Sequence, residues 1–185
     1  HFFNPSLEGS VPWSIFSELR YTYDSDTLAR AFLPPSANGG AGEFFRDAAR
    51  ALFSVLLVRL ANRGAVNTAD LARAFLEMPA EEMDHLIQAS VASSSIGGDS
   101  KQQRQGVLSS IAIYLNGIAA VGEGAWTIRD WLAKDDDSRL YILNTKDTEA
   151  MFAPLYRLML SVAFANIAAR QELVHEDRYW FWLDE

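Results

Sequence analysis

A continuous run of apolar residues, 179–183, is followed directly by the carboxylates of Asp184 and Glu185. A short uninterrupted apolar run is typical of a β-strand buried on both faces, as the strands of a parallel sheet are. In an open parallel sheet, ligands bind beyond the carboxyl ends of the strands. The run therefore predicts a buried strand with two acidic side chains where a ligand site forms. A strand that simply leads into an acidic turn remains the alternative.

Two adjacent carboxylates at such an edge suit a divalent cation. Their oxygens hold Mg²⁺ and orient a water molecule beside a nucleotide phosphate, which is the Walker B arrangement of a RecA-like ATPase. The chain begins at His1 rather than Met and ends on this acidic pair. We therefore expect it to be a piece of a longer protein.

The composition is that of a folded globular chain. The 185 residues are enough for one good core, and 49% hydrophobic with 22% charged residues argue against overall disorder. The absence of cysteine excludes disulfides, thiolate metal sites and a cysteine nucleophile. The net charge of −8 argues against a general nucleic-acid-binding surface. No apolar run approaches the length of a membrane span, so we expect this piece to be soluble.

The two ends of the chain have the pattern of an α/β sheet. Apolar residues at 1–3 predict a short strand, and those at 139–143 predict a second, buried strand. Residues 13–19 predict a short helix. Residues 148–169 predict a long helix, which is apolar around nearly its whole circumference and is therefore buried rather than amphipathic. A strand, this helix and the run at 179–183 would form a crossover between parallel strands.

The middle of the chain, from about residue 27 to 128, has purely helical patterns. Apolar residues recur at helical spacing, and glycine or proline punctuates the segments. We expect helices at 27–33, 43–62, 69–77, from 79 onward, at 101–121 and at 126–132, with loops at 36–42 and 93–100. A helical block between strand-containing flanks is the pattern of an insertion. The predicted fold class is mainly α: an α/β fragment with an all-α subdomain inserted between strands of one sheet.

Charge is unevenly placed along the chain. Residues 27–128 contain 8 Lys/Arg and 9 Asp/Glu, a net charge of −1, and the flanks contain the remaining 8 and 15, a net charge of −7. Within the block, arginines at 46–73 precede acids at 77–84. A solvated helix face has this pattern, as does a surface for a protein partner of complementary charge or a DNA-facing patch. We select Arg59 and Arg63 as candidate substrate-recognition residues.

Other catalytic or binding motifs are weak. The glycine-rich stretches at 36–42 and 97–101 lack the spacing of a phosphate-binding loop. His1, His85 and His175 have no metal-ligand spacing. These features are interpreted as loops and surface residues.

Five sequence elements occur in an order that resembles the type IV secretion coupling proteins, the TraD/TrwB-like conjugation ATPases. The elements are Phe3-Asn4-Pro5, Trp13-Ser14 with Glu18, Trp126-Thr127-Ile128-Arg129-Asp130-Trp131-Leu132, Leu140-Tyr141-Ile142, and the apolar run that ends in Asp184 and Glu185. The resemblance covers essentially the whole chain. In that family an all-α domain interrupts a RecA-like P-loop motor domain, between the strand that follows Walker A and the Walker B strand. The resemblance implies motor flanks at 1–26 and 129–185 and an all-α substrate-recognition domain at 27–128.

The resemblance also implies an activity for the longer protein. These proteins are hexameric ATPases anchored in the bacterial inner membrane, and they deliver a relaxase–DNA complex or protein effectors to the secretion channel from the cytoplasmic face. Asp184 would bind Mg²⁺ through water and Glu185 would polarise the attacking water. The longer protein would use ATP and Mg²⁺, with the relaxase or relaxosome, secreted proteins, single-stranded DNA and channel subunits as partners. This chain has no Walker A loop, so we expect it to be inactive alone. The alternative is a stand-alone helical interaction or regulatory domain.

Overall fold

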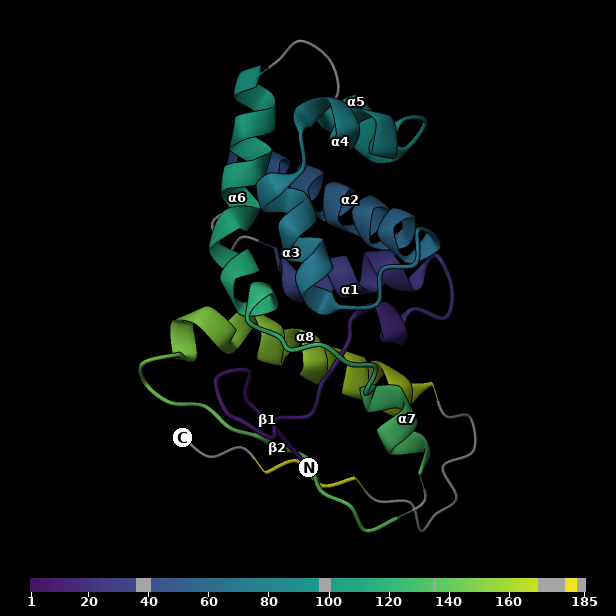
Figure 1. Cartoon of the computed structure of the whole chain (residues 1–185), viewed down its shortest axis with the longest axis vertical. Coiled ribbons are helices and arrows are strands. Elements are labelled where there is room, and N and C mark those ends of the chain that lie inside the picture. The colour runs from purple at the N-terminus through teal and green to yellow at the C-terminus, as the bar shows by residue number, and fades with distance from the viewer. Residues whose placement is uncertain (36–40, 97–100, 135, 170–178, 183–185) are drawn as a thin grey trace.

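A computed structural model describes residues 1–35, 41–96, 101–134, 136–169 and 179–182 (Figure 1). Over these residues the chain is mainly helical, with eight α-helices, one short 3₁₀ helix and two short strands. The helical block lies toward one end of the long axis, and the strands with the last two helices lie toward the other (Figure 1). The predicted fold class is confirmed.

The two strands join the beginning of the chain to a segment far along it. Strand β1, Phe2–Phe3, pairs in parallel with β2, Tyr141–Ile142. The backbone N–H of Tyr141 donates to the carbonyl of His1 at 3.0 Å, and that of Leu143 donates to the carbonyl of Phe3 at 3.0 Å. Helices α1 to α7 all lie in the connection between these adjacent strands. This is the arrangement that an insertion requires.

A second backbone contact closes the base of the insertion. Trp13 and Trp126 form a parallel β-bridge, in which Ser14 N donates to Trp126 O at 3.1 Å and Trp126 N donates to Pro12 O at 3.0 Å. The two segments approach so closely that a Cβ atom added at Gly124 would lie 2.1 Å from the Cβ of Pro12. Only glycine fits there without a shift of the backbone.

Helices α1 to α6 form the helical block. Their bounds are α1 Asp24–Phe32, α2 Ala41–Asn62, α3 Thr68–Glu77, α4 Ala80–Ile87, α5 Val91–Ile96 and α6 Lys101–Ala119. Helix α2 lies at the centre and packs against α1, α3, α4, α5 and α6. Its side chain Phe53 is fully buried and stacks on Phe32 of α1 with ring centroids 5.1 Å apart. Gly64, with φ of +88°, follows α2 in the left-handed conformation that the sequence predicts for a helix end.

Helices α7, Ile128–Ala133, and α8, Glu149–Ala168, lie beside the strands. Contrary to the expectation that no apolar run approaches the length of a membrane span, α8 is long and apolar enough to cross one by length and composition, with a mean hydropathy of 1.4. It packs against α1, α6 and α7 and buries Phe152, Leu155 and Met159. In this structure α8 is a core helix.

Two local predictions are wrong. Residues 13–19 form only the 3₁₀ helix η1, Phe16–Glu18, because Trp13 is held in the bridge to Trp126. The hydroxyl of Ser14 in this segment donates to the carbonyl of Val66. Residues 93–100, predicted as a loop, contain the end of α5, whose serines bond to carbonyls three residues earlier.

The predicted strand at 179–183 is also not observed. Among its described residues, 179–182, no strand forms, and the indole of Trp182 is 88% exposed. Tyr141 of β2, expected to be buried, is exposed as well. Tyr141 is exposed because the sheet has two strands in the described residues, so β2 has a neighbouring strand on one side only. Phe181 packs instead on Phe164 of α8, with ring centroids 4.6 Å apart.

Candidate functional site

The predicted cation pair, Asp184 and Glu185, lies outside the residues that the structure describes. Their role therefore remains a prediction. Within the described residues, no group of three or more His, Asp or Glu side chains is placed to hold a metal ion.

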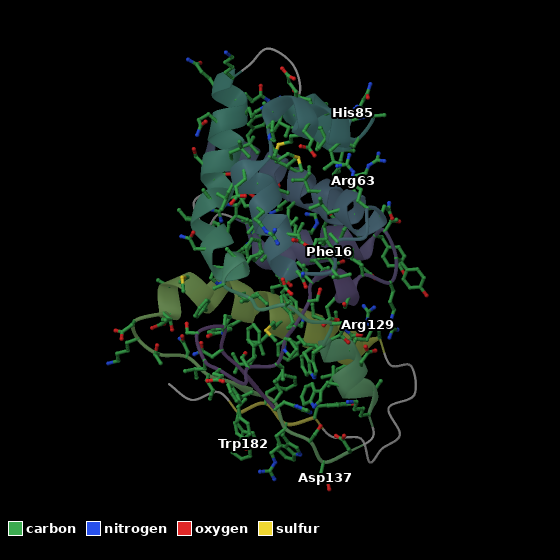
Figure 2. The ribbon with its side chains drawn as sticks, viewed as in Figure 1. Phe16, Arg63, His85, Arg129, Asp137 and Trp182 are labelled. Carbon is green, nitrogen blue, oxygen red and sulfur yellow. The ribbon has the colours of Figure 1, made fainter. Side chains whose placement is uncertain are left out.

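The candidate recognition residues Arg59 and Arg63 lie at the end of α2. Arg59 is exposed and has no ion pair with any described residue. Arg63 follows the last residue of α2, and its Nη1 lies 3.6 Å from Oε1 of Glu82 on α4, with both side chains about half exposed. An exposed pair of this kind is worth at most about 1 kcal/mol, so the guanidinium of Arg63 can exchange partners. Figure 2 shows Arg63 far along the long axis from Trp182.

The other arginines of this stretch bind within the chain. Arg46 Nη1 donates to the carbonyl of Pro34 at 2.9 Å, and Arg73 pairs with Asp70. Arg50 is buried and pairs with Glu43 at 2.9 Å and with a second carboxylate one turn away. Three of the five arginines at 46–73 therefore already have a partner on their own or a neighbouring segment. Of the arginine-rich stretch inferred from the sequence, Arg59 and Arg63 are the two arginines left as candidates for binding a partner.

A buried carboxylate, that of Glu18, connects the N-terminal flank to α7. The residue is 1% exposed, and its Oε1 accepts hydrogen bonds from the indole N–H of Trp13 at 2.9 Å and from the backbone N–H of Ile128 at 2.6 Å. Burial raises the pKa of Glu18, and these two hydrogen bonds oppose that rise. Thr127 caps the same helix end by accepting from the backbone N–H of Asp130 at 2.9 Å.

Arg129 extends this connection to two further helices. Its Nε donates to Oδ1 of Asn166 on α8 at 3.0 Å, and its Nη2 lies 3.9 Å from Oδ2 of Asp24 at the start of α1. A small pocket of about 60 Å³ lies among these side chains. Glu18 Oε2 and Arg129 Nη1 are both buried without a hydrogen-bond partner among the described residues. We call the group Trp13, Glu18, Asp24, Arg129 and Asn166 the junction cluster.

The junction cluster is where the three segments of the chain meet. Trp13, Glu18 and Asp24 come from the first flank, and Arg129 and Asn166 come from the second. Thr27, Leu28 and Ala31 of α1 also line the pocket. Trp13, Glu18 and the segment 126–132 carry the family resemblance in the sequence. Their spacing alone gave no sign that they bond to one another. The cluster fixes the flanks relative to α1 and offers no open nucleophile.

The family model of the type IV secretion-system coupling protein DNA-binding domain matches residues 1–185. The chain belongs to this family. Solved structures support the fold: the conjugative coupling protein TrwBdeltaN70, in its unbound form, is similar with a TM-score of 0.83 and 20% sequence identity, over 94% of this chain and 41% of that one. TrwB with the GTP analogue GDPNP gives a TM-score of 0.82 at 20% identity, over 94% of this chain and 42% of that one.

A third structure, TrwB in complex with ADP and Mg²⁺, is similar with a TM-score of 0.80 and 20% identity, over 91% of this chain and 40% of that one. The chain thus spans about two-fifths of the length of these coupling proteins. At this identity the likeness shows the fold. No match is found among the curated proteins.

Proposed function

We propose that this chain is the part of a conjugative coupling ATPase that recruits relaxase–DNA or protein substrates, and that the longer protein drives their transfer by hydrolysing ATP. The observation that carries the proposal is the closed base of the helical block, where β1 pairs with β2 and Trp13 pairs with Trp126. An inserted block of this kind leaves the two flanks free to belong to one sheet. We assign 1–26 and 129–185 to the motor domain and 27–128 to substrate recognition.

The nucleotide chemistry belongs to the longer protein in this proposal. Asp184 would hold Mg²⁺ through water, and Glu185 would polarise the water that attacks the γ-phosphate. Carboxylate oxygens are the donors that Mg²⁺ prefers, so the residues present fit this ion. Bound Mg²⁺ would neutralise charge on the phosphates. Support comes from the likeness to TrwB structures that hold ADP with Mg²⁺ or nucleotide analogues.

Cargo recognition is assigned to the exposed end of α2. Arg59 has no described ion-pair partner and Arg63 has only an exposed one, so both can bind an acidic surface on a relaxase, a relaxosome component or a secreted protein. The block is nearly neutral, which favours protein over general DNA binding at this face. In this proposal the longer protein also binds single-stranded DNA and the other channel subunits. It forms a homo-hexamer at the cytoplasmic face of the inner membrane.

The proposal is tested by charge reversal in the full-length protein. Arg59→Glu with Arg63→Glu should weaken capture of the relaxase and leave the ATPase rate unchanged, because no ion pair among the described residues joins either arginine to the motor flanks. Arg73→Glu is the matched control, since Arg73 is also exposed but lies on α3 in a pair with Asp70. Relaxase capture that is the same in the double variant and in the wild type would remove these residues from the recognition surface. The match over 1–185, flanks included, favours this function over a stand-alone helical domain.

A further inference from the structure

Two tyrosines form an exposed stack just before α1. The rings of Tyr21 and Tyr23 lie 5.0 Å apart, centroid to centroid, with an angle of 14° between their planes. Tyr21 is 58% exposed and Tyr23 is 66% exposed. Both rings leave much of their surface in solvent, so a further planar group can add to the stack. Neither residue is part of the recognition surface or the junction cluster described above.

The backbone holds this pair in place. Oδ2 of Asp24 accepts hydrogen bonds from the backbone N–H of Arg20 at 2.8 Å and of Tyr21 at 2.9 Å. The N–H of Asp24 donates to the carbonyl of Tyr21 at 3.1 Å, and that of Asp26 donates to the carbonyl of Tyr23 at 3.2 Å. A loop fixed in this way presents its aromatic faces without a large ordering cost on binding.

The same carboxylate connects the tyrosines to the second flank. Asp24 Oδ2 lies 3.9 Å from Nη2 of Arg129, which is bonded through Nε to Asn166 of α8. Figure 2 shows Arg129 at the level between the helical block and the layer of the two strands. The tyrosine loop, which lies in the first flank, is therefore also connected to the second flank. A ligand on the tyrosines would contact a segment that the motor flanks position directly.

We propose that the Tyr21–Tyr23 stack is a contact for the bases of single-stranded DNA. Unpaired bases stack on exposed aromatic rings, and such stacking tolerates any base sequence. The local charge also favours stacking over phosphate binding, because Asp24 and Asp26 offset the exposed Arg20 and Arg30. Duplex DNA does not offer its base faces and should not use this contact. The inference rests on the proposed function, in which DNA is among the substrates, and on the family's description as a DNA-binding domain.

The test measures binding of the whole chain to a fluorescein-labelled single-stranded 20-mer of mixed sequence by fluorescence anisotropy, over a salt series. Tyr21→Ala with Tyr23→Ala should weaken binding roughly tenfold or more, and Tyr21→Phe with Tyr23→Phe should keep it. The slope of log affinity against log salt should be the same for both, because no phosphate contact is removed. Tyr141→Ala is the matched control, an exposed tyrosine on β2.

Folding of the alanine variant is checked by circular dichroism, and Tyr23→Ala alone provides a milder change. A photocrosslink from a 5-bromouracil oligonucleotide to the wild-type chain, mapped by mass spectrometry, should fall on Tyr21 or Tyr23. Equal binding by the alanine and wild-type chains, crosslinks confined to other segments, or no single-strand binding by the wild type would overturn the proposal. So would a change of oligomeric state in the alanine variant without DNA, which would make this stack a protein interface. Relaxase capture by the Arg59 and Arg63 variants reports on the proposed function separately.

Discussion

Replacing Glu18 by alanine removes the oxygen that accepts from both Trp13 Nε1 and the backbone N–H of Ile128, and it leaves the two donors buried. A buried donor left without a partner costs about 1–3 kcal/mol, so the two together should lower the free energy of unfolding by about 2–6 kcal/mol. This is a large share of the roughly 5–15 kcal/mol that holds a domain folded. Glu18→Gln retains an oxygen at the same place and should cost about 1 kcal/mol.

The pH dependence separates the charge of Glu18 from its hydrogen bonds. Burial raises the pKa of Glu18 above its usual 4.5, so the folded chain keeps the proton at pH values at which the unfolded chain has lost it. The folded state then binds more protons, and the stability contributed by this group falls as pH rises from about 4.5 through the raised pKa. Glutamine does not titrate, so the stability of the wild type relative to Glu18→Gln should fall over the same window. Asp24 and Arg129 are present in both chains and cancel in this comparison.

The measurement is urea unfolding of the whole chain followed by tryptophan fluorescence, at several pH values between 4 and 8. The exposed Glu123 supplies the control, since Glu123→Ala removes a carboxylate without burying a donor. A loss below about 1 kcal/mol for Glu18→Ala would show that the two donors find other partners. A wild-type advantage over Glu18→Gln that grows with pH would show that Glu18 is stabilised, and not penalised, as a carboxylate.

Three further predictions concern the motor flanks and the base of the block. The purified chain should show no ATPase turnover in a phosphate-release assay, because it has no phosphate-binding loop; turnover above a buffer blank would contradict this. In the full-length protein, Glu185→Gln should keep nucleotide binding and lose hydrolysis and transfer, because the side chain keeps its shape but not its charge. A normal conjugation frequency in this variant would show that Glu185 has no catalytic role. Gly124→Ala should destabilise the chain by about 1–3 kcal/mol in thermal or urea unfolding, because its Cβ meets Pro12, whereas Gly122→Ala meets no atom within 4 Å and should be nearly neutral.

The long helices were predictable because their apolar residues repeat at helical spacing over many turns. Helices α2, α6 and α8 lie close to the ranges expected from that spacing, and Gly64 ends α2 as expected. Short segments follow their surroundings more than their own pattern. Residues 13–19 have a helical arrangement of apolar side chains, but the bridge between Trp13 and Trp126 extends the backbone there. The serine-rich α5 was missed because its helix is only six residues long.

The sequence likewise predicted some features of the candidate functional residues, and others are visible only in the structure. Counting charges located an arginine-rich stretch, but only the structure distinguishes the buried Arg50, paired with Glu43, from the exposed Arg59. The junction cluster joins Glu18 to Ile128, which are 110 residues apart, and no local pattern encodes such a contact. The apolar character of 179–182 predicted a strand, yet a strand also needs neighbours to bond with, and those are a property of the sheet rather than of the segment.

The pairing of β1 with β2 has a consequence for the order in which this protein folds on the ribosome. Phe2 leaves the ribosome before the helical block, but its partner Tyr141 is made only after that block. Helices α1 to α6 pack on one another, so the block can form before Tyr141 is made, whereas the strand pairing must wait. A folded block also brings distant parts of the chain together, as Phe32 of α1 packs on Tyr114 of α6, so the chain closes a shorter effective loop when Tyr141 appears. Strand β1 therefore stays unpaired until β2 has been synthesised. The folded helical block then brings the two flanks close enough to pair.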